Sequence, residues 1–459
     1  MLSSLRQPAF LKVLMLLLIM ALLCIPLGLI QGLIAERGQS QFEASQELAQ
    51  TYTSAQMLAG PVLVVPYVKS WQEARRNDKG EAIEGTVERS AEGAYLVFPE
   101  TLDLDGRMTP QTRYRGLFSI LFYRLEGTLH GRFPAFDANA IPRGPRDPHI
   151  ELKTPYVALR LSDLRGLEGA PLLTLAGAKL PFAQGAPGLP DRSWLASGIH
   201  APLTGAALAQ WRGGQPMDFD LPLTVVGQER FAVAPVAGET TAHLQSSWAD
   251  PSFGGSFLAA ERTVGAQGFD ARWRVAALVS NAREQVRALA LFQGNEAGLP
   301  DGNVQSFDVS LAQPLNVYAM ATRAAKYGAL FISLMLLAAF MFELFKKLRL
   351  HPVQYALVGL AIALFFLLLV ALSEKIVFWQ AYAAAACASV ALLAVYFSAI
   401  LQGWRRGLSL GGFAAILYAA LYGLLASEDN ALLLGALLVF AMLAALMLVT
   451  RKVDWYALK

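Results

Sequence analysis

Glu343 is the residue of this sequence whose surroundings point most clearly to chemistry, because it is a carboxylate at the end of a long apolar run. It lies about one turn before the basic pair at 346–347, and Arg349 and His351 follow. A carboxylate in this setting either forms an ion pair that locks a tight helical hairpin, stays solvated at the membrane interface, or serves a proton relay or a ligand. We expect the first, with Arg349 or His351 as the partner.

Other charged residues stand at further turns of the apolar region. Glu374 is either an interfacial carboxylate or a docking contact for the exported part of the chain. Arg323 and Lys326 come just before the apolar region and are candidates for coupling the two parts. Asp454 and Trp455 lie in a short tail, where basic and aromatic neighbours favour anchoring at the membrane interface and leave partner binding as the alternative.

Motifs of several common enzyme classes are absent from the chain. It contains no HExxH, GxGxxG or P-loop pattern, which lowers the expectation of metal and nucleotide chemistry together. Four histidines, His130, His149, His200 and His243, are scattered in different contexts, so isolated histidines are favoured over a metal site assembled from distant residues. We expect no enzyme, no cofactor, no bound metal and no nucleic-acid partner.

The elements that carry these residues follow from hydropathy. With 55% hydrophobic and 16% charged residues and a mean hydropathy of +0.41, the chain is too apolar for an ordinary soluble enzyme. A bilayer core of about 30 Å needs roughly 20 apolar residues per helix. The chain offers six such runs, and we predict one amino-terminal and five carboxyl-terminal transmembrane helices at 11–34, 328–345, 352–373, 377–401, 408–425 and 431–449.

Cationic residues set the expected orientation. Arg6, the basic turns at 346–349 and 405–406, and the pair at 451–452 fall on one side, while acidic residues mark the other. The positive-inside rule then puts both termini in the cytoplasm. The predicted parts are a cytoplasmic start, a first helix, a periplasmic domain, a five-helix bundle and a cytoplasmic tail, at 1–10, 11–34, 35–326, 327–450 and 451–459.

The first helix is expected to remain attached. Its apolar core is longer than that of a cleaved signal, and GLIQGLIA at 28–35 offers no convincing cleavage site. Leu23 is too bulky for a typical lipobox before Cys24. Because the other cysteine, Cys387, is also in an apolar run, the exported domain has no cysteine and must be held by its own core.

The exported region alternates apolar and polar residues in short segments bounded by Gly, Pro and Asp. This pattern predicts strands and a mainly antiparallel, sandwich-like β domain. Helices are expected at 39–57, prolonging the first membrane helix, and at 281–291, whereas the polar segment 69–94 is expected to be a hairpin tip or mobile loop. The predicted strands are 62–69, 123–133, 156–161, 217–226, 269–275 and 306–311.

The sequence resembles the CreD family of bacterial inner-membrane proteins. RLHPVQYALVGLA at 349–361 is the most specific match, with the LHP-x-QY element after a basic turn. Further matches are RAAKYGALFI at 323–332, FFLLLVALSEK at 365–375, TRKVDWY at 450–456, AGPVLVVP at 59–66 and WADPSFGGSFLAAERTV at 248–264. The family often has Ser-Glu-His where this chain has Ser-Glu-Lys at 373–375, so a histidine role there is not expected.

The resemblance implies an inner-membrane protein of Gram-negative-type bacteria, tied in some relatives to a two-component response, to envelope integrity and to tolerance of colicins or β-lactams. It implies no catalytic reaction. We therefore expect a non-enzymatic protein that lies in the lipid bilayer and binds an envelope lipid, glycan or protein through its periplasmic domain. The alternative is a transporter or lipid-handling protein that passes an apolar ligand from the domain to the bundle; a membrane-bound enzyme is a third reading.

Overall fold

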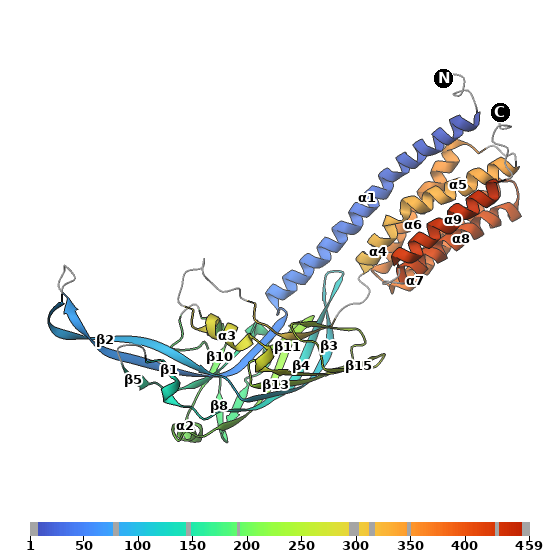
Figure 1. Cartoon of the computed structure of the whole chain (residues 1–459). Helices are drawn as coiled ribbons and strands as arrows, with labels where there is room; N and C mark the ends of the chain where they lie inside the picture. The colour runs from blue at the N-terminus through green and yellow to red at the C-terminus, as the bar shows by residue number, and fades with distance from the viewer. Residues whose placement is uncertain are drawn as a thin grey trace. The chain divides into compact units, whose positions relative to one another are not determined.

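The structure, a computed structural model, describes residues 8–76, 82–143, 148–190, 193–292, 303–311, 317–346, 350–426 and 431–451. The chain divides into two compact units (Figure 1). A helical unit holds Met1–Glu43 and Leu315–Lys459, and a β unit holds Ala44–Pro314.

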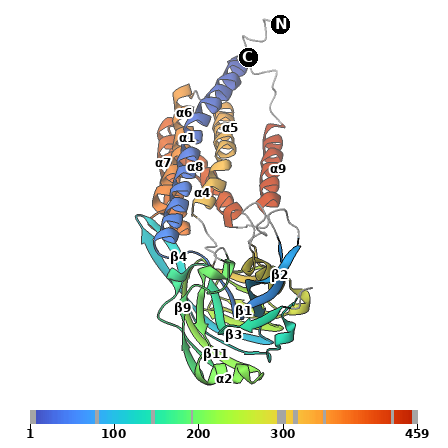
Figure 2. The ribbon, with the colours of Figure 1, turned by 90° about the vertical axis from the view of Figure 1, so that its left-hand side faces the viewer.

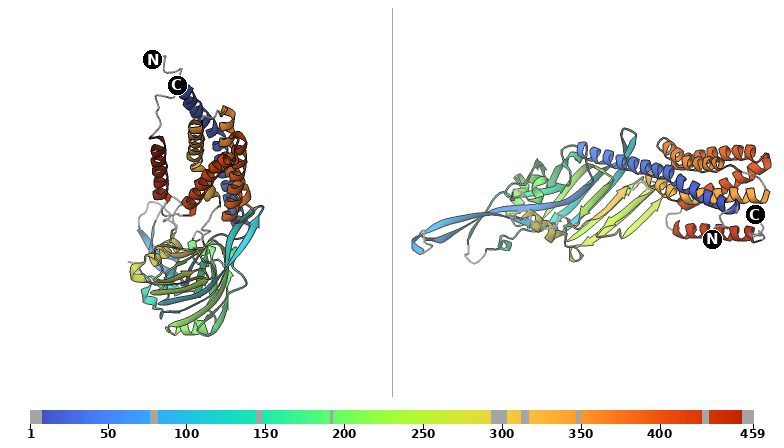
Figure 3. Two further views of the ribbon diagram at one scale, coloured as in Figure 1. Left: turned by 90° about the vertical axis from the view of Figure 1, so that its right-hand side faces the viewer. Right: turned by 90° about the horizontal axis from the view of Figure 1, so that it is seen from above.

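Long apolar segments form the helices. The first is α1 (Pro8–Thr51), and its last turns, from Ala44, belong to the β unit. After the β unit come the short amphipathic α4 and then five apolar helices, of which α6, α7 and α8 pack in succession (Figures 2 and 3). Their bounds are α4 (Val317–Lys326), α5 (Gly328–Lys346), α6 (Pro352–Ser373), α7 (Phe378–Ile400), α8 (Trp404–Ala426) and α9 (Ala431–Thr450).

All six predicted apolar runs lie in helices, but the described helices that could cross a membrane give four or five spans rather than the predicted six. Within the described ranges, α1, α6, α7 and α8 are each long and apolar enough to cross a membrane, and α4 with α5, bent by 42°, would make a fifth. The sixth run lies in α9, a helix of 20 residues that is not among these candidate spans. The described structure therefore supports four or five spans.

One face of α1 packs against the other helices of its unit. A stripe at helical spacing is buried, whereas the opposite face is exposed, as lipid contact requires. Leu23 fits over Gly359 so closely that a Cβ there would lie 2.1 Å from its Cδ1, and Leu27 fits over Gly328 in the same way. The buried stripe is Ile19, Leu23, Leu27, Ile30 and Ile34, and the exposed face includes Leu14, Leu18, Leu22, Ile25 and Leu29.

The β unit contains two sheets. The nine-stranded sheet has the order β14-β17-β12-β1-β6-β10-β9, with β2 and β5 also paired to β1. Its strands are β1 (Gln56–Arg76), β2 (Ala82–Val97), β5 (His149–Leu152), β6 (Tyr156–Leu161), β9 (Ala183–Gln184), β10 (Ile199–Pro202), β12 (Arg230–Ala234), β14 (Pro251–Gly255) and β17 (Phe307–Leu311).

The eight-stranded sheet has the order β15-β16-β13-β3-β4-β11-β7-β8. Short helices complete the unit: η2 (Ala138–Ala140), η3 (Leu164–Gly166), η4 (Trp194–Ser197), α2 (Gly205–Arg212), η5 (Ala277–Val279) and α3 (Ala282–Ala290). The strands are β3 (Thr101–Arg115), β4 (Phe118–Phe133), β7 (Leu172–Leu175), β8 (Ala178–Pro181), β11 (Met217–Gln228), β13 (Glu239–Ser246), β15 (Glu261–Gly265) and β16 (Gly268–Ala276).

Strand pairing is mixed. β1 pairs with β12 in parallel, and β3 with β13, while the other pairs among the described strands are antiparallel. The prediction of a mainly antiparallel domain fits this pattern. It misses the two parallel pairs because each joins strands far apart in the sequence, which local alternation cannot reveal.

Side chains from both sheets form one buried cluster. Leu63 and Val157 come from the first sheet, and Leu104 and Leu129 from the second. In the eight-stranded sheet burial alternates along strands such as β3, because successive side chains of a strand point to opposite faces, whereas β6 of the first sheet is buried on both faces. The centre of the cluster is filled by large side chains, which include Tyr123, Phe133, Phe231, Trp273 and Phe307.

Most of the elements predicted between the first helix and α4 are confirmed. The six predicted strands lie in β1, β4, β6, β11, β16 and β17, and the helix predicted at 281–291 is α3. The helix predicted at 39–57 does continue the first membrane helix, but it ends at Thr51 because β1 begins at Gln56.

The segment 69–94 forms the outer part of a hairpin, as one of its two predictions had it, but most of it is paired strand rather than a tip or a mobile loop. β1 and β2 pair from Leu63 opposite Val97 to Arg76 opposite Ala82, so most of this segment is a long two-stranded arm that projects from the sheets (Figure 1). Residues 77–81 lie outside the described residues. The strands were missed because both faces of the outer arm meet water and their sequence is polar without alternation.

Candidate functional site

The solvent side of the eight-stranded sheet carries a regular array of polar side chains, which we call the charged face. They come from alternate positions of the strands, whose other side chains fill the core. Pairing aligns them in rows across the sheet. Asp103 of β3 is opposite His130 of β4 and Thr241 of β13, and Asp105 is opposite His243.

Two of the four histidines considered from sequence, His130 and His243, lie on the charged face, and each contacts at least one carboxylate. His130 Nδ1 lies 2.6 Å from Asp220 Oδ2. His243 Nε2 lies 3.0 Å from Asp270 Oδ2, and its Nδ1 lies 3.4 Å from Asp105 Oδ1. The hydrogen bond from His243 holds the pKa of Asp270 below its usual value. Among the described residues, no three His, Cys, Asp or Glu side chains are placed to hold a metal ion.

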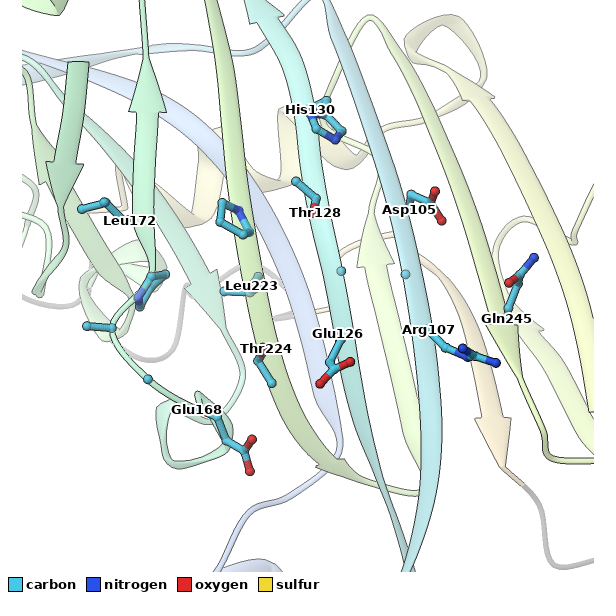
Figure 4. A pocket seen from close by; sticks show the side chains of 16 residues that line it. Asp105, Arg107, Glu126, Thr128, His130, Glu168, Leu172, Leu223, Thr224 and Gln245 are labelled. Carbon is cyan, nitrogen blue, oxygen red and sulfur yellow. The ribbon is translucent and has the colours of Figure 1, made fainter. Parts of the chain in front are cut away.

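A groove of about 670 Å³ lies in the charged face, and we call it the face groove (Figure 4). Its floor is formed by β3, β4, β11 and β13, and residues 168–172, between η3 and β7, form part of its lining. Gly106 and Gly127, which are paired across β3 and β4, line the groove with backbone atoms. The polar side chains that line it are Asp105, Arg107, Glu126, Thr128, His130, Glu168, Thr224 and Gln245.

Most charged side chains of the face groove already have partners. Arg124, beside the groove, forms ion pairs with Glu126 and with Glu168, whose Oε2 lies 2.7 Å from Arg124 Nε. Gln245 donates to Asp270 over 2.6 Å. These contacts neutralise the carboxylates and fix the walls of the groove.

Arg107 differs from these neighbours. Its cross-strand neighbours are Glu126 and Gln245, yet both bond to other residues, and no described residue forms an ion pair or hydrogen bond with its side chain. The hydroxyls of Thr128 and Thr224 line the same groove. A guanidinium with free donors beside two hydroxyls suits a ligand rich in acceptor oxygens, above all a carboxylate or phosphate.

Glu343, the carboxylate singled out from sequence, is buried in the helical unit. It is 3% exposed and lies near the end of α5. Lys12 of α1 forms an ion pair with it, Tyr355 Oη donates to its Oε2 over 2.6 Å, and Leu350 N donates to its Oε1 over 3.2 Å. The carboxylate therefore joins α1, α5 and α6.

This arrangement differs from the predicted pairing of Glu343 with Arg349 or His351. The His351 ring instead caps α6, where Nδ1 accepts a hydrogen bond from Val353 N, and Arg349 lies outside the described residues. Sequence reasoning missed Lys12 as the partner. A signal existed, because Lys12 is the one charged residue in the apolar stretch from 8 to 35.

Glu374 makes a second contact of this kind in the helical unit. Its carboxylate accepts a hydrogen bond from Tyr318 Oη over 3.0 Å, and Arg37 Nε of α1 lies 3.8 Å away. α1 thus carries a basic residue near each end of its apolar stretch, and each one faces a carboxylate of the later helices. Both predicted carboxylates contact the first helix.

The remaining candidates from sequence are Arg323, Lys326, Asp454 and Trp455. Arg323 and Lys326 are exposed on α4. Asp454 and Trp455 lie outside the described residues, so their anchoring role stays a prediction.

Comparison with known proteins places the chain among membrane proteins. A family model described as "Inner membrane protein CreD" matches residues 8–456. A curated protein of that description from Escherichia coli (strain K12) is 32% identical over 453 residues, which cover 99% of this chain and 95% of that protein.

Two solved structures of an M1 zinc metallopeptidase from Deinococcus radiodurans show a weak likeness. One has a TM-score of 0.20 and 10% identity, covering 46% of this chain and 41% of that one. The other, a mutant with a bound peptide substrate, has a TM-score of 0.21 and 8% identity, covering 50% and 53%. Scores this low carry no argument about fold or activity.

Proposed function

Because this chain belongs to the CreD family of inner-membrane proteins, we propose that it is a non-enzymatic, multi-pass protein that supports the bacterial cell envelope, including under stress, by binding an envelope component through its β unit. The face groove is the observation that carries the proposal. Among the described residues that line it, fixed walls surround one cation without an ion-pair partner, Arg107, and two hydroxyls.

The proposed topology has six spans, cytoplasmic termini and a sandwich-like periplasmic domain. Support for the orientation comes from the basic residues at 346–349 and 405–406 and from Arg451, all at one set of helix ends. The sixth span would be α9, whose 20 residues are enough for a bilayer core of about 30 Å. The core shared by the two sheets supports the sandwich.

The proposed ligand is an anionic, oxygen-rich envelope molecule. An arginine binds carboxylate or phosphate through two parallel hydrogen bonds, and this geometry suits Arg107. Glycan hydroxyls or peptide carbonyls would meet Thr128 and Thr224. A carboxylate-bearing peptidoglycan fragment offers both kinds of group.

The interior of the β unit supports binding at its surface rather than carriage of an apolar ligand. A lipid-handling domain needs an apolar channel, but large aromatic side chains occupy the space between the sheets. Polar groups converge instead on the outer face, where water-soluble groups of an envelope component are accessible.

Binding to the full-length protein in nanodiscs tests the proposal directly. The probe is a set of soluble muropeptides released by lysozyme, and their binding is titrated by calorimetry. Arg107→Gln should weaken binding about tenfold or more, since a charge-assisted bidentate contact is worth about 1.5–3 kcal/mol.

The matched control is Arg274→Gln. Arg274 lies on the same charged face, 3.5 Å from Glu239, but outside the face groove. Its substitution should leave the affinity unchanged. Absence of muropeptide binding, or equal loss in both variants, would contradict the proposed site.

A further inference from the structure

β3 carries two opposite charges next to each other on the charged face. Asp105 and Arg107 occupy alternate positions of this strand, so their Cα atoms are about 6.8 Å apart and their side chains leave the same face of the sheet. Both line the face groove, as Figure 4 shows. In the part of the β unit that the structure describes, no ion pair joins them. The groove therefore contains a cation and an anion that are separated from each other.

The carboxylate of Asp105 can accept further hydrogen bonds. Its side chain is 71% exposed, and its contact with His243 Nδ1 spans 3.4 Å. A neutral imidazole has a single N–H, and the other ring nitrogen, Nε2, lies closer to a second carboxylate, 3.0 Å from Asp270 Oδ2. The one proton of a neutral His243 therefore serves Asp270. The oxygens of Asp105 are left to accept hydrogen bonds from a ligand.

Asp103, two residues earlier on β3, lacks this freedom. Its Oδ1 accepts a hydrogen bond from Thr241 Oγ1 over 2.6 Å. It also lies outside the lining of the face groove. The two aspartates share a strand and a face, but Asp105 is the one placed to contact a ligand in the groove.

The residues opposite Asp105 and Arg107 on β4 leave both charges available. Thr128 is opposite Asp105, and Glu126 is opposite Arg107. Because Glu126 forms an ion pair with Arg124, its charge is already balanced. The hydroxyl of Thr128 can donate or accept a hydrogen bond. A ligand that lies across these positions therefore meets an anion, a hydroxyl and a cation.

A dipolar ligand suits this arrangement better than a simple anion or a simple amine. A phosphate attracted by Arg107 would also meet the like charge of Asp105, and an amine attracted by Asp105 would meet the like charge of Arg107. A ligand with an ammonium and a carboxylate on one carbon satisfies both residues, because each group forms a charge-assisted hydrogen bond with its opposite. This pair of groups is the α-amino acid zwitterion.

We propose that the face groove selects a stem peptide that carries an α-amino acid zwitterion, with the carboxylate at Arg107 and the ammonium at Asp105. The inference rests on the proposed binding of a peptidoglycan fragment, and it specifies which group of that fragment is recognised. The side chain of diaminopimelate ends in such a zwitterion, whereas that of lysine ends in an ammonium alone. Stem peptides that contain diaminopimelate should therefore bind more tightly.

Three muropeptides that differ in this group test the inference on the full-length protein in nanodiscs. Each is a disaccharide tripeptide, and its third residue is diaminopimelate, diaminopimelate acetylated on its free amine, or lysine. In calorimetric titrations the first should bind at least about fivefold more tightly than either of the others, because each of those lacks one of the two charge-assisted contacts.

Variants assign each contact to its residue. Asp105→Asn should lower the affinity for the diaminopimelate tripeptide to that for its acetylated form and leave the affinity for the acetylated form unchanged. Arg107→Gln should lower it to about that for the lysine tripeptide. The matched control is Asp103→Asn, which removes a carboxylate of the same strand outside the groove and should leave all three affinities unchanged.

Equal affinities for the diaminopimelate tripeptide and its acetylated form would overturn the inference and leave the proposed binding of peptidoglycan fragments in place. Equal losses for these two ligands in Asp105→Asn would do the same. If none of the three muropeptides bound, the inference and the proposed function would both be wrong.

Discussion

The helical unit and the β unit use charged side chains in different ways. In the helical unit Glu343 is 3% exposed and bonds to α1 and α6. On the charged face of the β unit, Asp218 and Arg132 form a pair 2.5 Å apart with side chains 71% and 53% exposed. The first contact assembles helices, whereas the second lies on a surface open to ligands.

The two kinds of contact should contribute different free energies to the stability of the protein. A charge within apolar surroundings is costly unless it is paired, so removing one partner leaves a large penalty. A solvated pair contributes about 0–1 kcal/mol, because water and salt compensate for its loss. Substitutions should therefore disturb folding in the helical unit and mainly alter recognition on the charged face.

The largest expected effect is that of Glu343→Ala, which leaves Lys12 and Tyr355 without their acceptor. We expect a loss of about 3 kcal/mol or more in stability, measured by thermal unfolding of the full-length protein in detergent. Asp218→Ala should cost less than about 1 kcal/mol under the same conditions. Equal losses would erase the contrast between the two units.

A smaller effect is expected at the contact between α1 and α6. Gly359→Ala places a Cβ 2.1 Å from Leu23 Cδ1, so either the buried Leu23 side chain must leave its position or the helices must separate, at a cost of about 1–3 kcal/mol. Gly412→Ala is the matched control, because no atom lies within 4 Å of its Cβ and alanine favours the helix by up to about 1 kcal/mol. The two variants should shift the midpoint of thermal unfolding in opposite directions; a rise for Gly359→Ala would show that α1 is not packed there.

The smallest effect concerns pH on the charged face. Because His243 holds the pKa of Asp270 below its usual value, this carboxylate stabilises the fold above the unfolded pKa of about 3.9, and the contribution disappears as the pH falls through the lower, folded value. Asp270→Asn should therefore reduce the loss of stability between pH 5 and pH 3, by less than about 1 kcal/mol. Thermal unfolding measured between pH 5 and pH 3 tests this prediction. If stability depends on pH in the variant as it does in the unchanged protein, the contact of Asp270 with His243 does not stabilise the fold.

The sequence predicted elements better than it predicted their partners. Apolar runs of sufficient length identified the helices, and alternation identified β11 and β16, along which buried residues alternate with more exposed ones over several positions. The contact of Lys12 with Glu343 joins residues more than three hundred positions apart. The isolated charge of Lys12 in its apolar stretch indicates that it needs a partner, but no local pattern identifies Glu343 as that partner.

The face groove could not be predicted from the sequence for the same reason. Asp105 and His243 become neighbours only through the parallel pairing of β3 with β13. Arg107 is a candidate ligand-binding residue because its own cross-strand neighbours bond to other residues. Neither the order of strands nor the choice of ion-pair partner can be read from period-two alternation.

Site-specific crosslinking in living cells tests most directly whether recognition lies in the face groove. The photoreactive residue p-benzoylphenylalanine replaces Gln245, which lines the groove, or Arg274, which lies outside it on the same face. We predict an envelope adduct, with its mass reduced by lysozyme, at 245 and none at 274, and we predict that Arg107→Gln removes it. Equal adducts at both positions, or an adduct at 245 that Arg107→Gln leaves intact, would contradict the account.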